Sequence, residues 1–106
     1  LSSVFNMLTN GRKELRPTAF VTGNDYTAVQ IMQYVKKMGL RIPEDVAIVG
    51  VDNVYLATVV TPALTSVDFS KEEFCQKLAD TMLKLVDGEI PEGEYIKVSV
   101  VVRDSA

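Results

Sequence analysis

The chain has 106 residues, a formal net charge of −3 and a sequence pI near 4.8, so it offers no basic face for phosphate contacts and is expected to bind nucleic acid poorly by itself. It has no histidine and a single cysteine, Cys75, a composition that argues against a zinc site of His and Cys ligands and leaves no partner for an internal disulfide. We therefore expect neither a metal nor a cofactor.

The first half of the chain has the pattern of a strand, a helix and a second strand. Residues 1–10 carry apolar side chains on one helical face, and a polar loop leads to a short apolar strand at 18–22. Asn24 or Asp25 caps a helix over 25–38, and Gly39 ends it. The predicted buried stripe of that helix is Ala28, Ile31, Met32, Val35 and Met38. The next strand, 46–51, is almost wholly apolar, which is typical of a strand covered on both faces.

The second half of the chain continues the α/β pattern. Residues 52–60 are predicted to be irregular or to form one short helical turn, and 64–67 a strand. Ser70 caps a helix over 71–87, and 95–102 is the last strand. The residues predicted to face inward from the 71–87 helix are Phe74, Cys75, Leu78, Ala79, Met82, Leu85 and Val86. The expected fold is α/β with a mostly parallel sheet.

Polar side chains follow the first two strands directly, where open parallel sheets bind ligands. The amide of Asn24 can donate and accept hydrogen bonds, which suits sugar hydroxyls or the edge of a base. A carboxylate at Asp52 can accept two hydrogen bonds from vicinal hydroxyls, and Asn53 can line the same cleft. The alternatives are local: Asn24 and Asp25 as helix caps, and Asp52 and Asn53 as turn residues.

Several motifs, taken in order over about 17–105, resemble the effector-binding domain of LacI/GalR-type bacterial transcription regulators. The motifs are Gly23-Asn-Asp25, Gly39-Leu-Arg-Ile-Pro-Glu-Asp-Val46, Val49-Gly-Val-Asp-Asn53, Thr61-Pro-Ala-Leu-Thr-Ser-Val67 and Val101-Val-Arg-Asp-Ser105. The resemblance implies a partial periplasmic-binding-protein-like type I fold, a three-layer α/β/α arrangement represented here mainly by its C-terminal lobe. It also implies ligand-contacting roles for Asn24 and Asp52.

The resemblance divides the chain into three parts. Residues 1–67 are similar to the rear of the C-terminal lobe, 68–94 to a crossover and a helix of the other lobe, and 95–106 to the returning strand. In this family the C-terminal lobe also dimerises. That implies a homodimer interface at Tyr26, Val29, Val59 and Val60, apolar residues outside the predicted core stripe.

The implied function is non-enzymatic sensing of a small effector, a sugar, sugar phosphate or purine, by a cytoplasmic regulator. Operator DNA would bind a headpiece that this chain does not include. The sequence starts with Leu1 and has neither a signal-peptide pattern nor an apolar run long enough to cross a membrane, so we expect a piece of a longer cytoplasmic protein. A periplasmic sugar-binding transport protein, which shares the fold, is the alternative.

Three other classes of site fit poorly. A phosphoacceptor receiver domain would need an early acidic pair and a later lysine, and neither stands in the right order. No Gly-x-Gly-x-x-Gly follows a strand, and without histidine no Ser/His/Asp constellation can form. We therefore assign no catalytic residue.

Overall fold

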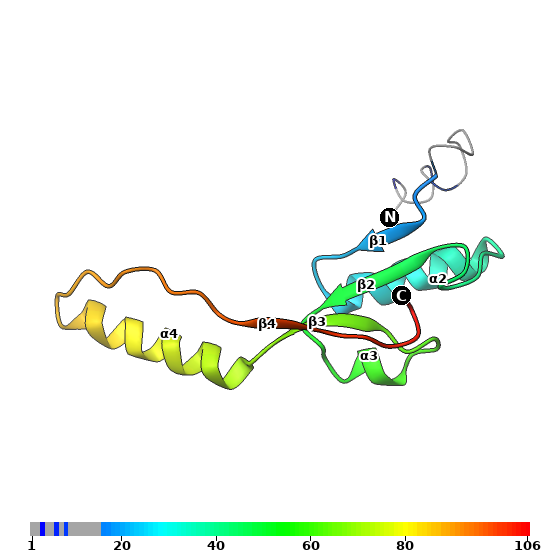
Figure 1. The fold of residues 1–106 in the computed structure, drawn as a ribbon. Helices are drawn as coiled ribbons and strands as arrows, with labels where there is room; N and C mark the ends of the chain where they lie inside the picture. Colours follow the sequence, from blue (N-terminus) through cyan, green and yellow to red (C-terminus); the bar gives the residue numbers. More distant parts are fainter. Residues whose placement is uncertain (1–2, 4–5, 7, 9–15) are drawn as a thin grey trace.

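The computed structural model describes residues 3, 6, 8 and 16–106, and these form a mixed α/β structure around one open sheet (Figure 1). The strands are β1 (Ala19–Val21), β2 (Ala47–Val51), β3 (Thr65–Phe69) and β4 (Val98–Val101), and the helices are α2 (Asp25–Lys37), α3 (Leu56–Val59) and α4 (Lys71–Val86). The strand order is β1-β2-β3-β4, with β1, β2 and β3 parallel and β4 antiparallel to β3. The predicted α/β class and mostly parallel sheet are confirmed.

Helix α2 begins and ends where the sequence predicts. Asn24 is extended and its side-chain oxygen accepts the N–H of Thr27 at 2.8 Å, which satisfies one free donor of the first turn. Of the two candidate caps, Asn24 is the one used. Lys36 and Lys37 occupy the last turn, and Gly39 follows with a φ of +74°.

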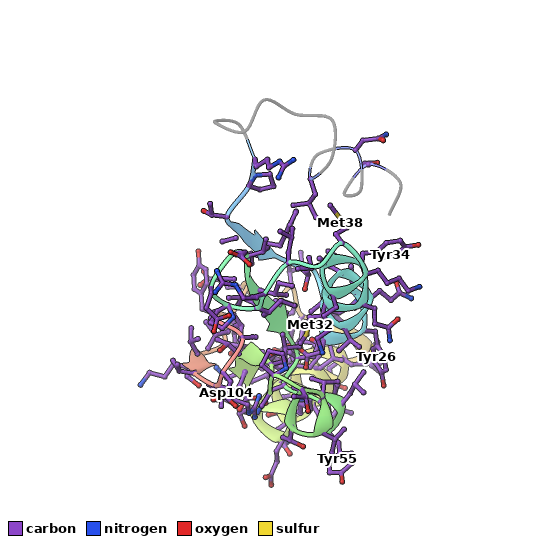
Figure 2. All side chains as sticks on the ribbon, turned by 90° about the vertical axis from the view of Figure 1, so that its right-hand side faces the viewer. Tyr26, Met32, Tyr34, Met38, Tyr55 and Asp104 are labelled. Atoms are coloured by element: carbon purple, nitrogen blue, oxygen red, sulfur yellow. The ribbon has the colours of Figure 1, made fainter. Side chains whose placement is uncertain are left out.

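The core lies between α2 and the sheet. Four residues of the predicted stripe are buried and Met38 packs against them half-buried; the buried four are Ala28, Ile31, Met32 and Val35. Figure 2 shows Met32 on the inner side of α2 and Tyr26 on its outer side. In β2 only Ile48 and Gly50 are buried, and the other three residues are half-buried. The expectation that both faces of this strand are fully covered is therefore wrong within this chain.

The predicted N-terminal helix lies almost entirely outside the described residues. Ser3, Asn6 and Leu8 have helical backbone. Leu8 is 1 % exposed and joins the same core cluster as Ile48 and Val35. The one apolar residue of that helix that can be assessed thus packs as predicted.

Helix α4 departs furthest from expectation. The helix and the segment that follows it run side by side away from the sheet (Figure 1). The molecule is therefore elongated and measures 56 × 27 × 18 Å. The radius of gyration is 18.0 Å, against about 13 Å for a compact domain of this size. No residue of α4 is buried, and Cys75, predicted to be buried, is exposed. The start and the Ser70 cap of α4 are as predicted. Its apolar face meets the sheet only at its first turn, where the Phe74 ring lies edge-to-face on Phe69 at the end of β3, and the rest of that face is not covered by the described residues.

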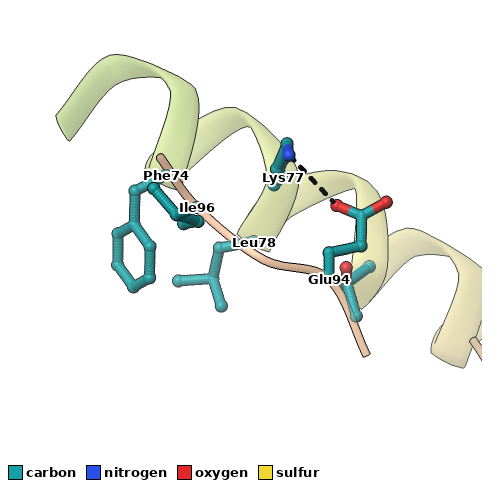
Figure 3. A pocket seen from close by; sticks show the side chains of 6 residues that line it. Phe74, Lys77, Leu78, Glu94 and Ile96 are labelled. Atoms are coloured by element: carbon teal, nitrogen blue, oxygen red, sulfur yellow. Dashed lines mark ion pairs between the residues drawn. The ribbon is translucent and has the colours of Figure 1, made fainter. Parts of the chain in front are cut away.

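The side chain of Lys77 links the segment after α4 to the helix. Lys77 Nζ lies 3.2 Å from Glu73 and 4.0 Å from Glu94, and donates to the carbonyl of Tyr95 at 3.2 Å. Figure 3 shows the ion pair of Lys77 with Glu94 beside a shallow pocket lined by Phe74, Leu78 and Ile96. The backbone at 95–97 is therefore held beside α4 and not in the sheet, and β4 begins at Val98 instead of the predicted 95.

The loop before β2 is fixed by a local ion pair. Arg41 Nε and Nη2 each donate to the Asp45 carboxylate at 2.9 Å, and the backbone N–H of Arg41 donates to it at 2.8 Å. These hydrogen bonds stabilise the charged form and lower the pKa of Asp45 to about 2. The pair is exposed, so its net contribution to stability is small.

This ion pair predicts a pH-dependent effect of Asp45→Asn. A carboxyl whose pKa is lowered by folding stabilises the protein above its unfolded pKa, and that contribution disappears as the pH falls through the folded pKa. We expect the variant to be slightly less stable than the parent at neutral pH, and the difference to vanish as the pH falls from about 4 to about 2. Urea unfolding at a series of pH values measures it, with the exposed Glu92→Gln as control. A difference that grows in acid would contradict the assignment.

Candidate ligand-binding edge of the sheet

The carboxyl ends of the parallel strands bring the predicted ligand residues to one edge. Val21 pairs with Val49, and Val51 pairs with Val67. Beyond these pairs the N–H of Thr22 donates to the carbonyl of Val49 at 3.0 Å, and the N–H of Asp52 to that of Val67 at 2.9 Å. Asn24 follows β1 at this edge and Asp52 follows β2, so sequence order and sheet topology put both beside the ends of the same strands.

Asn24 keeps hydrogen-bonding capacity although it caps α2. Its Oδ1 accepts from Thr27, while its amide nitrogen donates to no residue in the described part of the chain. The side chain is half-buried at the start of the helix. An amide carries two N–H donors, so capping and ligand contact do not exclude each other at this position.

Asp25 has a structural role that the sequence did not reveal. It is fully buried, and its Oδ1 accepts the hydroxyl of Ser66 at 2.6 Å while Oδ2 accepts the N–H of Val54 at 2.8 Å. The carboxyl group thus joins the start of α2 to β3 and to the loop after β2. Gly50 makes room for it, since a Cβ there would lie 2.1 Å from Asp25 Oδ1. In the sequence, an acidic residue beside a cap indicates only the start of a helix. Its hydrogen bonds to Val54 and Ser66, 29 and 41 positions away, cannot be predicted from the neighbouring residues.

Asp52 and Asn53 form a strained turn. Their φ angles are +100° and +48°, in the left-handed region, where each such residue costs about 1–3 kcal/mol unless its surroundings hold it. The N–H of Asn53 donates to Ser66 Oγ at 3.1 Å, and its Oδ1 accepts from Arg103 at 2.7 Å. The carboxylate of Asp52 receives no hydrogen bond or ion pair from the described residues. It is half-exposed and available to a ligand.

A lysine from the start of α4 reaches the same turn. Lys71 Nζ donates to the carbonyl of Asp52 at 2.5 Å, lies 3.7 Å from the carboxylate of Asp68, and sits 5.3 Å from the centre of the Phe69 ring. Its side chain is 53 % exposed, so these contacts are partly screened by solvent. Carboxylates outnumber cations here, a balance that suits hydroxyl groups better than a bare anion.

The four residues predicted to form a dimer interface lie on or next to α2 and α3, which contact each other. Tyr26 and Val59 are 63 % and 53 % exposed, and Val29 and Val60 are half-buried and line one shallow hollow. Lys36 Nζ donates to the carbonyl of Thr61 at the rim of that hollow. The described structure thus places the four positions on or beside two elements in contact, and brings Val29 and Val60 to one hollow.

Two features are absent from the described residues. No three or more side chains of His, Cys, Asp and Glu are grouped so that they could hold a metal ion. Of the helices in the part of the chain that is described, none has both the length and the apolar character to cross a membrane.

The chain is similar in sequence to a known domain family and to several regulators. Residues 3–106 match the periplasmic binding protein-like domain. Over 93 residues the chain is 37 % identical to the NTD biosynthesis operon regulator of Bacillus subtilis, covering 85 % of this chain and 28 % of that protein. Over 90 residues it is 38 % identical to the ribose operon repressor of Escherichia coli strain K12, covering 85 % and 27 %.

Solved structures agree with the sequence relatives. The chain superposes on the lac repressor dimer bound to operator and the anti-inducer ONPF with a TM-score of 0.82 and 28 % identity, over 98 % of this chain and 36 % of that one. It matches the transcriptional regulator CelR in complex with cellobiose with a TM-score of 0.75 and 27 % identity, over 84 % and 28 %.

The chain spans about a quarter to a third of the length of the relatives that it matches. Those relatives are transcriptional regulators, and the resemblance to LacI-type regulators expected from the sequence is confirmed. The match of the family over 3–106 includes every described strand and helix. The chain therefore belongs to the periplasmic binding protein-like domain family.

Proposed function

We propose that this chain is the effector-sensing and dimerisation part of a bacterial DNA-binding transcriptional regulator that acts in the cytoplasm and catalyses no reaction. Its relatives are named as operon regulators and repressors, and one structural neighbour is a dimer on operator DNA. The observation that carries the proposal is the edge of the sheet, where Asn24 and Asp52 each keep unused hydrogen-bonding groups. DNA contact belongs to a headpiece outside this chain.

The effector proposed for this edge is a small polar molecule with hydroxyl or ring-edge groups, a sugar, sugar phosphate or purine. Asp52 would accept hydrogen bonds from two hydroxyls and Asn24 would donate through its free amide nitrogen. The amide nitrogen of Asn53 has no acceptor among the described residues and can contribute beside Asp52. Cellobiose in the related CelR complex shows that a sugar is bound by a regulator of similar fold.

The division of the chain into parts is also a proposal. Residues 1–67 would belong to the C-terminal lobe, 68–94 would cross to the other lobe, and 95–106 would return. It is supported by the lack of any buried residue in α4 and by the exposure of apolar side chains such as Leu78 (57 %) and Met82 (59 %). An amphipathic helix normally buries its apolar face, so a second lobe against α4 accounts for both observations.

Regulation would follow from differential affinity for two arrangements of the lobes. An effector that binds one arrangement better shifts the population toward it, with a typical coupling of about 1–3 kcal/mol. The surface formed by Tyr26, Val29, Val59 and Val60 would transmit this change to a second copy of the protein. In that way the spacing of two DNA-binding headpieces depends on the effector.

A periplasmic sugar-binding transport protein is the second candidate. It is favoured only by the shared fold, and the regulator is preferred because the similar proteins above are regulators and repressors. The sequence upstream of this chain distinguishes the two classes. A helix-turn-helix would support the regulator, and a signal peptide would support transport.

The ligand site predicts a loss of effector affinity in Asp52→Ala. Removing hydrogen bonds to a charged acceptor should weaken binding by more than about tenfold in the full-length protein, because such bonds are worth about 1.5–3 kcal/mol. A thermal-shift screen of sugars and purines identifies the effector, and calorimetry measures the affinity. Asp87→Ala, at the end of α4, is the matched control. Equal affinity in the Asp52 variant and the control would defeat the site assignment.

A further inference from the structure

The Asp52–Asn53 turn depends on residues outside it. Two consecutive non-glycine residues with positive φ persist only where neighbouring groups hold them. The backbone of Asp52 sets the direction of its side chain. Whatever fixes this turn therefore also sets where the free carboxylate of Asp52 points.

Arg103 is the better anchored of the two cations that reach the turn, and it acts beside Ser66 Oγ, which accepts the N–H of Asn53 at 3.1 Å. Its Nη2 donates to Asn53 Oδ1 at 2.7 Å and its Nη1 to the carbonyl of Leu64 at 2.7 Å. Its backbone N–H donates to Thr65 Oγ1 at 2.9 Å. The planar guanidinium thus bridges Leu64 and Asn53, and Arg103 makes three hydrogen bonds in all, two of them to the consecutive residues Leu64 and Thr65.

The other cation at the turn is held less firmly. Lys71 is more than half-exposed and donates only to the Asp52 carbonyl within the turn. A flexible ammonium with solvent around it fixes geometry less well than a bridging guanidinium. Arg103 is therefore the cation that decides the conformation of the turn.

We propose that Arg103 is a positioning residue for the ligand site: it holds Asn53 in its left-handed conformation and thereby orients the Asp52 carboxylate. The role of Asp52 in this inference rests on the proposed function. Arg103 lies 50 residues from Asn53 in sequence, beyond β4. The ligand edge built by β1 and β2 is thus complete only after the segment following α4 has returned to the sheet.

Hydrogen exchange tests the structural half of the proposal without a ligand. In the full-length protein, Arg103→Met should speed exchange at the amides of Asn53 and Val54 by about tenfold, because the turn opens locally once this support is lost. The amide of Val35, on the buried face of α2, should stay protected. Lys97→Met is the matched control, because Lys97 is an exposed cation near the same end of the chain with no described hydrogen bond.

Binding tests the functional half. The probe is whichever of D-ribose, L-arabinose and cellobiose the parent protein binds most tightly. Arg103→Met should weaken the affinity for this sugar by about fivefold or more, because the turn no longer holds the Asp52 carboxylate in position. Arg103→Lys keeps one charged donor and should restore part of the affinity. A purely structural role would lower the melting temperature in these variants without this ordered loss and recovery of affinity.

Each result either supports or overturns the proposal. Unchanged exchange at Asn53 and Val54 in Arg103→Met overturns it. If Asp52→Ala binds the sugar weakly, Arg103→Met with faster exchange but unchanged affinity also overturns it. If Asp52→Ala keeps full affinity, the proposed ligand role of Asp52 fails, and exchange alone decides whether Arg103 holds the turn.

A second variant covers the case in which Arg103→Met does not fold. Asn53→Gly removes the acceptor while permitting a positive φ, so it should also speed exchange at Val54. Protection at Val54 equal to that of the parent protein would overturn the proposal.

Discussion

Replacing Asp25 with alanine is expected to lower the free energy of unfolding by about 3 kcal/mol, because one buried and one part-buried donor lose their acceptor at about 1–3 kcal/mol each. The donors are the hydroxyl of Ser66 and the N–H of Val54, which are 2.6 and 2.8 Å from the carboxyl oxygens. No water reaches a residue that is 0 % exposed without a structural change. Chemical unfolding followed by circular dichroism measures the loss.

The neighbouring Asn24→Ala is the matched control. It removes the cap of α2, a change that costs about 1 kcal/mol, and it leaves the buried link intact. The two substitutions remove side chains of similar size from adjacent positions. The difference in their losses of unfolding free energy therefore reports the effect of burial and of the long-range hydrogen bonds of Asp25. A larger loss of stability in the Asn24 variant than in the Asp25 variant would show that the buried carboxyl group is not the stronger tie.

Local patterns were sufficient to predict most of the fold. The apolar stripe of α2 has helical spacing, and the cap, the basic last turn and the glycine all lie within a few residues of it. The strands after it are short apolar runs that parallel pairing buries on at least one face. Placing Asn24 and Asp52 at one edge then followed from the rule for parallel sheets. Each of these inferences uses residues close in sequence.

The predictions failed where the contact partner lies far away in sequence or is not among the described residues. The helical pattern of α4 was correct, but its apolar side remains exposed, with Leu85 at 51 % and Val86 at 75 %. Periodicity shows which face is apolar and not what covers it. The links from Asp25 to Ser66 and from Arg103 to Asn53 span 41 and 50 residues. Such contacts are set by strand order and register, which composition and spacing do not determine.

Gly50→Ala is expected to destabilise the protein by about 3 kcal/mol or more, although alanine normally suits a strand better than glycine. An ideal Cβ at this position would lie 2.1 Å from Asp25 Oδ1 and 2.9 Å from Leu64 Cδ2. Both neighbours are fully buried, so neither can move aside easily. Gly93→Ala is the control, because nothing lies within 4 Å of a Cβ there, and its effect should stay within about 0.5 kcal/mol.

Combining the two substitutions shows whether the clash and the buried carboxyl group are one feature. In Asp25→Ala the group nearest to a new Cβ is gone, so adding Gly50→Ala should cost less than in the parent protein by about 1 kcal/mol or more. Some penalty should remain, because Leu64 Cδ2 stays at 2.9 Å. Strictly additive effects in unfolding measurements would mean that Gly50 is required for a reason unrelated to Asp25. A clear coupling would establish that β2 carries a glycine here so that the carboxyl group of α2 can reach β3.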